Sequence, residues 1–448
     1  MSVIGIDFGS SFSTVTWINP HSGKPEAVKF NGDGSVKFPS IIFSTEEGFH
    51  YGFQAASYYD EISLLPQQQR IEYLPNFIPS LKRIMDPNGL EFFFNRRYTH
   101  NQLLTSFLQN LISQAQSHCG TDYLIDNIVI SHPVDFAQNK IRMIKDSLFS
   151  LGYHQVDTQY EPVSAVYGYS IDHEICEGEG ILVFDFGGGT IDVAFIQRQN
   201  GELVVVTEPK GDGRCGGQDI DFALYNNLRN TLISEQNYDI TNNGIIDQVV
   251  LNACRRLKEK FSGNYDVYET MILLQIDGHI CNYKYRLSRD SFNDIISPIV
   301  ASAIDVAGSV ISDVNDRELS IDKILLIGGS SQLTIIRDML LTKLGHGTTI
   351  ETCGEKDIVV ALGNIASHEI IQISEELTPD DNNTSNYLYP SEEPLNYDRA
   401  ICCKNCGKER CYHFAQGAKV EEKKKTWYHC VDCGWEGPNV VVRYKSQD

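Results

Sequence analysis

The sequence has no excess of basic residues, no long uninterrupted apolar run and no basic stretch at its N-terminus. Of its 448 residues, 37 are Lys or Arg and 59 are Asp or Glu, so the net charge is −22. Because such a chain repels polyanions, non-specific binding of nucleic acid by the whole protein is disfavoured. We find no apolar run as long as a membrane span and no secretion signal, so we expect no membrane partner and a cytoplasmic location.

Cysteine is sparse over the first 400 residues, which hold six, whereas the other six lie between Cys402 and Cys433. Scattered Cys in a reducing compartment usually act as small apolar residues, whereas clustered Cys indicate a metal site. Lys and Arg are absent from residues 374–398, which are rich in Glu, Asp, Asn, Ser and Pro. This composition predicts an acidic, solvated linker over residues 374–400.

One short pattern occurs twice, beginning near Val3 and again near Ile181. Each copy is an apolar run that ends in Asp (Asp7 and Asp185), then a Gly turn, then small hydroxyl residues and a second apolar run. The pattern predicts strand, turn, strand. Glycines in the turn allow backbone N–H groups to approach an anion such as phosphate, and the Asp is placed to hold hydrated Mg²⁺. Two facing hairpins would bind a polyphosphate from both sides.

The rest of the first 373 residues alternates between helix and strand patterns. Apolar spacing predicts helices over residues 99–119, 137–151, 219–232, 248–261, 291–314 and 333–344, and strands over 128–130, 203–207, 270–285 and 323–327. Alternation of this kind indicates an α/β fold, and the length allows two or three domains.

Two Cys-x-x-Cys-Gly knuckles predict a structural Zn²⁺ site in the C-terminal module, residues 401–448. The four thiolates belong to Cys403, Cys406, Cys430 and Cys433, and the 23 residues between the knuckles suit a β-hairpin. A pair of disulfides is the alternative, disfavoured in the cytosol. Nearby Cys402, Cys411, His413 and His429 are alternatives for one ligand. The module resembles a zinc ribbon. Lys423–Lys425, with Trp427, Tyr428 and Trp435, could contact nucleic acid, but a solvated hairpin tip whose aromatics cover a thin core is favoured, and protein docking fits equally well.

The order of the motifs resembles the nucleotide-binding domain of the Hsp70 family. Gly5–Ser13 resembles its first phosphate motif, and Val183–Val193 resembles the second almost residue for residue. Five further segments follow the family's order: Ser80–Arg83 (the segment of the catalytic lysine), Glu161–Ala165 (the first connecting motif), Gly211–Asp221, Leu326–Ser330 (the adenosine motif) and Asp357–Gly363 (the second connecting motif).

The resemblance implies a two-lobed actin/Hsp70-like ATPase fold of the α/β class over residues 1–373. Lobe I would span about 1–176 and lobe II about 177–373, with exchange near two hinge helices and a deep nucleotide cleft between the lobes. The family's peptide-binding β-sandwich and lid have no counterpart in the residues after Ile373. The zinc ribbon would stand in their place.

The resemblance also implies the site residues. Lys82 would place the attacking water, Glu161 would assist it, and Asp7 and Asp185 would hold Mg²⁺ through water. Contacts to ATP or ADP are expected from Gly9, Ser10, Ser11, Gly187, Gly188, Gly189, Thr190, Gly216, Gly217, Lys258, Ser262, Gly328, Gly329, Ser330 and Asp357.

Three positions depart from the family's adenine pocket. Gln332 follows Ser331 where the family has Arg after the Gly-Gly-Ser turn, Arg255 stands where Glu is typical, and Glu259 stands where a second Arg is typical. An Arg pair can stack on both faces of a base, so its loss weakens the expected preference for adenine and leaves phosphate binding intact.

The function expected from these residues is ATP hydrolysis with Mg²⁺. Lobe closure would then control a protein partner or client, held by the ribbon or by the surface of the nucleotide-binding domain, in the manner of a chaperone. A small-molecule kinase on the same fold and an actin-like, nucleotide-gated scaffold are the alternatives.

Overall fold

A computed structural model describes residues 2–30, 34–65, 69, 72–241, 247–276, 279–344, 348–353 and 358–376, and the backbone of 399–402, 411–415, 426–430, 436–437 and 441–444. The chain forms two compact units, Met1–Gln372 and Ile373–Asp448. Each is described by itself.

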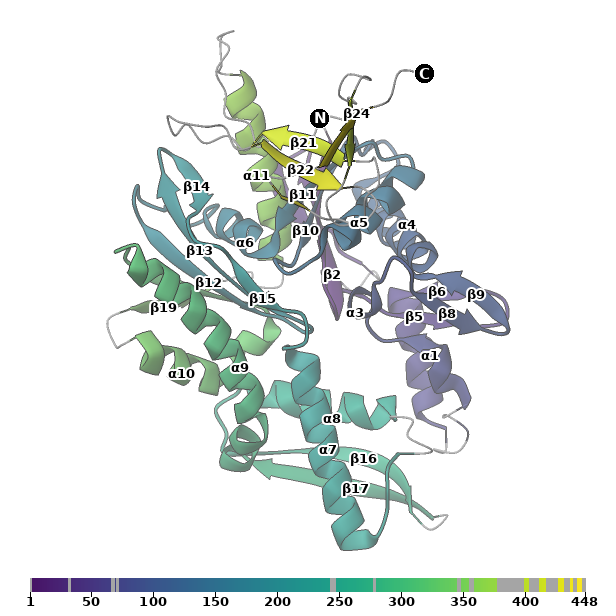
Figure 1. The fold of residues 1–448 in the computed structure, drawn as a ribbon. Helices are drawn as coiled ribbons and strands as arrows, with labels where there is room; N and C mark the ends of the chain where they lie inside the picture. The colour runs from purple at the N-terminus through teal and green to yellow at the C-terminus, as the bar shows by residue number, and fades with distance from the viewer. Residues whose placement is uncertain are drawn as a thin grey trace. The chain divides into compact units, whose positions relative to one another are not determined.

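Two sheets with the same strand order form the framework of the first unit (Figure 1). The first sheet runs in the order β11 (Gln155–Tyr160), β10 (Asn127–His132), β1 (Val3–Phe8), β2 (Phe12–Asn19) and β3 (Lys24–Ala27). The second runs in the order β19 (Thr349–Thr352), β18 (Lys323–Ile327), β12 (Gly180–Phe186), β13 (Ile191–Gln199) and β14 (Glu202–Val205). The repeat predicted from two short motifs therefore extends over whole sheets.

The register of the two hairpins places their acids at equivalent positions. β1 and β2 are antiparallel and pair Asp7 with Thr14, whereas β12 and β13 pair Asp185 with Asp192. In each sheet the hairpin's first strand also pairs in parallel with β10 or β18. Short strands extend the hairpins, β4 (Phe38–Pro39) along β2 and β15 (Lys210–Asp212) along β13.

Amphipathic helices cover these sheets. In the first half, α4 (His100–Cys119) and α5 (Gln138–Ser150) join the strands in one buried cluster, and Thr99 caps α4 in a capping box with Gln102. In the second half, α9 (Arg289–Asp316) and α10 (Thr334–Leu344) do the same. The helices predicted over 99–119, 137–151, 291–314 and 333–344 are confirmed, with ends shifted by one or two residues.

Each half carries an addition away from its main sheet (Figure 1). The first half adds β5 (Ile42–Ser44), β6 (Phe49–Tyr51), α1 (Gly52–Ser63), β7 (Phe77–Ile78), α3 (Leu81–Ile84), β8 (Leu90–Phe93) and β9 (Arg96–Thr99). The second half adds α7 (Gly217–Gln236), α8 (Gln248–Lys260), β16 (Val267–Ile276) and β17 (His279–Ser288). Both helices predicted here and the strand-rich stretch are confirmed.

Helix α9 corrects the expectation that no apolar segment of the chain is as long as a membrane span. Its 28 residues have a mean hydropathy of 1.8 in the most apolar window, so by length and composition alone it could cross a membrane. Polar residues interrupt its apolar residues, so the sequence shows no continuous apolar run of that length. It buries Phe292, Val300, Ile304 and Val310 in the same cluster as the second sheet, as core helices of this composition do.

Two helices cross where the halves meet, α6 (Glu161–Tyr169) and α11 (Val359–Glu376). The crossing is close: a Cβ on Gly363 would lie 1.6 Å from the carbonyl oxygen of Ser164. Asn364 accepts a hydrogen bond from the Ser164 hydroxyl at 2.6 Å and donates to the carbonyl of Ile6 in β1 at 2.9 Å. Because Val163 and Val166 of α6 pack on Val183 of the second sheet, the crossing ties the two sheets together.

The second unit is described as backbone only. β21 (Cys411–Ala415), β22 (Thr426–Cys430) and β23 (Glu436–Gly437) form an antiparallel sheet, and β20 (Arg399–Cys402) pairs with β24 (Val441–Tyr444). The β21–β22 hairpin lies between the two knuckles. Of the four expected ligands, Cys403, Cys406 and Cys433 lie outside the described residues, as does the side chain of Cys430. The expected linker over 374–400 begins inside α11, which continues to Glu376, and ends inside β20.

We predict that Gly363→Ala lowers the free energy of unfolding of the full chain by about 1–3 kcal/mol, because the new methyl group would overlap backbone at the crossing. The loss should appear despite the gain in helix propensity of roughly 1 kcal/mol. Urea unfolding measures it.

Gly308→Ala in α9 is the matched control, since its methyl group would meet only the flexible end of Lys343. If the two variants unfold at the same urea concentration, the close crossing is not a constraint on stability.

Candidate functional site

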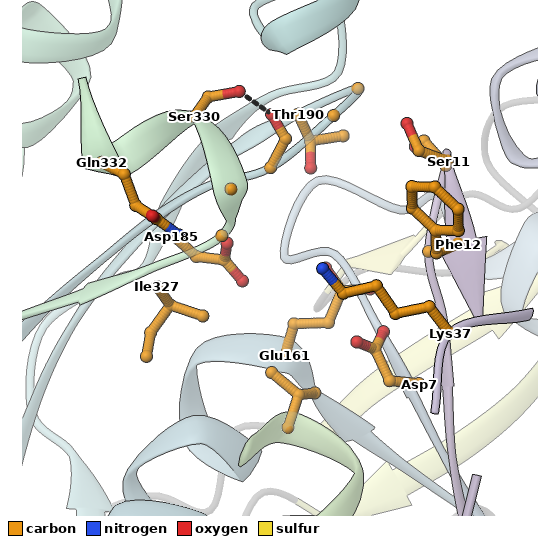
Figure 2. A pocket seen from close by; sticks show the side chains of 18 of the residues that line it. Asp7, Ser11, Phe12, Lys37, Glu161, Asp185, Thr190, Ile327, Ser330 and Gln332 are labelled. Carbon is orange, nitrogen blue, oxygen red and sulfur yellow. Dashed lines mark hydrogen bonds between the residues drawn. The ribbon is translucent and has the colours of Figure 1, made fainter. Parts of the chain in front are cut away.

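A cleft of about 390 Å³ opens where the two hairpins meet, and residues of both sheets line it. Figure 2 shows Asp7, Ser11 and Phe12 on one side, Asp185, Ser330 and Gln332 on the opposite side, and Glu161 between them. Sixteen of the expected site residues line the cleft: Asp7, Gly9, Ser10, Ser11, Lys82, Glu161, Asp185, Gly187, Gly188, Gly189, Thr190, Lys258, Ser262, Gly328, Gly329 and Ser330.

The two hairpin turns approach each other closely, and glycine makes this possible. A Cβ on Gly188 would lie 2.5 Å from the Ser11 hydroxyl oxygen, and one on Gly189 would lie 2.3 Å from that of Ser10. The hydroxyls of the first turn thus face the bare backbone of the second. Backbone N–H groups and hydroxyls in such turns are donors suited to the oxygens of a phosphate chain.

A buried ion pair forms one wall of the cleft. Lys82 Nζ, on α3, donates to Glu161 Oε1 at 2.5 Å, and the two residues are only 4% and 6% exposed. Lys82 also lies over the ring of Phe136 at 5.7 Å. Burial disfavours the charge on Lys82, but the Glu161 and Asp7 carboxylates outweigh this and raise its pKa. Glu161 is the first residue of α6, where the helix dipole favours a carboxylate.

Three aspartates surround this pair, and each has a raised pKa. Burial, with repulsion from Glu161, raises the pKa of Asp7 to about 7 and that of Asp192 to about 8. The same causes raise the pKa of Asp185 well above its usual value. Four carboxyl groups therefore converge on a single lysine, and without a further cation burial favours the protonated, neutral form of the three aspartates.

The chemistry of these groups fits a hydrated divalent cation. Oδ2 of Asp192 is buried without a hydrogen-bond partner, and carboxylate oxygens are the ligands that Mg²⁺ prefers. Within the described residues, no three His, Cys, Asp or Glu side chains lie close enough to hold a metal directly. Asp7 and Asp185, for which the sequence predicts contact with Mg²⁺ through water, both line the cleft.

Gly216 and Gly217 lie behind the second turn and do not line the cleft. Gly217 N donates to the Gly187 carbonyl at 3.0 Å, and a Cβ on Gly216 would lie 2.5 Å from the backbone of Gly189. The two glycines let α7 pack against the turn, so in this structure they support it from behind. Asp357, the remaining predicted contact, lies outside the described residues.

One face of α8 forms the other end of the cleft. Arg255, Lys258 and Glu259 recur at helical spacing and line it, as does Ser262 just beyond the end of the helix. Opposite them, Ser330 donates to the Gly187 carbonyl at 2.9 Å. Gln332 lines the cleft where the resemblance leads one to expect an arginine, so no guanidinium faces Glu259 from that turn.

Sequence reasoning missed two residues that join the halves. Arg83 donates to Asp219 Oδ2 at 2.6 Å and to the Gly189 carbonyl at 3.2 Å, which links α3 to the second turn. Asp192 Oδ1 accepts from Val134 N, beyond the end of β10, at 2.8 Å. The repeated motif could have pointed to Asp192, because Asp192 pairs with Asp185 in the second hairpin as Thr14 pairs with Asp7 in the first. No sequence signal pointed to the partners of Arg83.

Two facing hairpins, a deep acidic site and a crossing of two helices define a protein of the two-lobed actin/Hsp70-like ATPase fold. The Hsp70 protein family model matches residues 71–378, more than half of the chain, so the chain belongs to the Hsp70 family. It is an Hsp70-like ATP-binding protein, and members of this family bind ATP or ADP with Mg²⁺ and hydrolyse ATP. The match begins after the first hairpin, so the family comparison does not cover that hairpin. The structure shows that its residues line the cleft.

We predict that the metal-free protein becomes less stable as the pH rises from 6 to 8. The carboxyl group of Asp192 has an ordinary pKa of 3.8, and the folded state raises this pKa to about 8, so over this range the folded state binds more protons than the unfolded state. The neutral carboxyl group of Asp192 contributes a stabilisation of the folded state that is complete below pH 3.8 and is lost as the pH rises through about 8. Urea unfolding in EDTA should show a decrease of at least about 1 kcal/mol.

Asp192→Asn keeps the acceptor for Val134 N and removes the titration, so its stability should depend less on pH. Asp122→Asn, at an exposed position, should behave as the wild type. Equal pH slopes for Asp192→Asn and the wild type would show that Asp192 does not retain its proton in the folded state.

Proposed function

We propose that this protein binds Mg–ATP between the two hairpins, hydrolyses it, and uses the change in lobe closure to control a protein partner. The close approach of the Ser10–Ser11 turn to the Gly188–Gly189 turn, above the Lys82–Glu161 pair, supports this proposal most directly. ATP hydrolysis requires mainly positioning and charge neutralisation from the protein, and the cleft offers both.

The residues have distinct roles in this proposal. Ser10, Ser11 and the backbone of Gly188 and Gly189 bind the phosphate oxygens. Lys82, held by Glu161, orients the attacking water and offsets charge on the terminal phosphate. Bound Mg²⁺, held by Asp7 and Asp185 through water, neutralises phosphate charge.

The way in which the halves are joined supports the proposal that the lobes close around nucleotide. The crossing of α6 and α11 is the tight connection between the two sheets, whereas Arg83 and Asp192 join them at the cleft itself. Nucleotide between the turns would bias how these contacts are made, and the surface of the two halves would transmit the change to the partner. A chaperone-like cycle on a protein client is the function this arrangement supports.

We predict that Lys82→Ala lowers the kcat for ATP by about 100-fold or more, because the group that positions the attacking water is lost. Nucleotide affinity should change far less. Release of inorganic phosphate and calorimetric titration of the full chain measure the two quantities.

Lys24→Ala, on exposed β3, is the control and should match the wild type. Unchanged turnover in Lys82→Ala would exclude the proposed chemistry. A phosphorylated acceptor in place of free phosphate would support the small-molecule kinase, and ATP-dependent light scattering would support the actin-like scaffold.

For the C-terminal unit we propose a structural zinc ribbon, in a cytoplasmic protein, that recruits the partner. The Cys403/Cys406 and Cys430/Cys433 spacing supports it, as does the β21–β22 hairpin between the knuckles. A module this small has little core, so the metal would supply much of its folding free energy. A protein partner fits the acidic chain better than nucleic acid does.

We predict about one zinc ion per chain by elemental analysis of the purified full-length protein. Cys430→Ser together with Cys433→Ser should lose that zinc, because each knuckle supplies two of four ligands. Cys176→Ser, at an exposed position of the first unit, should retain it. Full zinc content in the double variant would refute the ribbon.

A further inference from the structure

Arg255 is a residue of the cleft that the proposed chemistry does not use. It lies on α8 on the same face as Lys258, and its side chain is 28% exposed. The neighbouring Arg256 is more exposed and is not among the residues that line the cleft. Two adjacent arginines of one helix are thus placed differently, one in the cleft and one outside.

The guanidinium of Arg255 reaches the first hairpin turn, which belongs to the opposite sheet. Its Nη2 donates to the Ser11 hydroxyl at 3.4 Å. Ser11 faces Gly188 of the second turn, so the guanidinium lies beside the gap between the two turns. A group in this position is within reach of an anion bound between them.

Arg255 also retains donors that its protein contacts do not use. Its Nε donates to Asp221 Oδ2 at 3.3 Å, while Lys258 Nζ lies 2.8 Å from Asp221 Oδ1. One buried carboxylate is therefore shared by two cations, and Lys258 has the shorter contact. A guanidinium has five N–H donors, and the two contacts of Arg255 are both long. Glu259 lies on the same helix face, but the described residues show no ion pair of 4 Å or less between it and either cation.

We propose that Arg255 binds an oxygen of the phosphate chain of the nucleotide, and so connects α8 of the second half to the phosphate held by the first hairpin. Guanidinium and phosphate form strong, directional hydrogen bonds, and the Ser11 hydroxyl marks where that phosphate would lie. The 3.4 Å hydrogen bond from Arg255 to Ser11 would be replaced by a charged hydrogen bond from Arg255 to the phosphate, which the first hairpin also binds. The inference rests on the proposed function, because it requires a nucleoside phosphate in this cleft.

A nested set of ligands separates a phosphate contact from a nucleoside contact. Calorimetric titration of the full chain with Mg–ATP, Mg–ADP, AMP and adenosine, at fixed ionic strength, compares the wild type with Arg255→Ala. We expect Arg255→Ala to weaken binding of ATP and ADP by about tenfold or more, and binding of adenosine by less than about twofold. Arg255→Lys should bind ATP and ADP more tightly than Arg255→Ala does but less tightly than the wild type, because lysine keeps the positive charge and lacks the paired N–H donors of the guanidinium.

Arg256→Ala is the matched control and should bind all four ligands as the wild type does. If Arg255→Ala does not fold, Arg255→Gln gives the same comparison with a side chain of similar size. Equal losses for ADP and adenosine, or no loss for either, would overturn the inference and leave the proposed function intact. A wild-type protein that binds none of the phosphorylated ligands would overturn both.

Discussion

The close approach of two glycine-bearing turns is the constraint on which this structure depends. The hydroxyls of Ser10 and Ser11 lie where any Cβ on Gly189 or Gly188 would have to stand. A side chain in the second turn would push the two sheets apart and remove the donors from one side of the cleft. Gly216 behind the turn and Gly363 at the helix crossing play the same part, because each allows two backbone segments to come into contact where elements meet.

The distribution of charge is the second constraint. Acidic side chains lie at one end of the cleft, and two basic side chains lie at the other. Asp7, Asp185 and Glu161 line the bottom of the cleft with Lys82, and buried Asp192 lies near them, whereas Arg255 and Lys258 share Asp221 at the α8 end. Burial makes the acidic end costly without a cation, which is why the pKa values of its aspartates are raised. Magnesium and a phosphate chain have the charges that such a divided cleft would neutralise, with the metal at the acidic end and phosphate toward the arginine.

Much of the fold could be predicted from local pattern. The hairpins at Asp7 and Asp185 were evident because their turn chemistry is local, and α4 was evident because its apolar residues recur at helical spacing. Other features could not be read in this way. The partners of Arg83 are more than a hundred residues away in sequence, and the apolar length of α9 was concealed by polar residues scattered along it. Gly216 and Gly217 matched a motif, yet their packing behind the turn depends on how α7 meets the second sheet.

By itself the sequence determined that two Asp-Phe-Gly hairpins exist, that they belong to an α/β protein with the motif order of the Hsp70 family, and that a Cys-rich module follows. These are local facts, because strands, turns and knuckles are encoded within about ten residues. Only the tertiary structure decided how closely the two turns approach, that Asp192 joins the acids, and that Arg255 reaches Ser11 of the opposite hairpin. Such choices depend on packing between segments distant in sequence, where burial and hydrogen-bond partners select one side chain over its neighbour.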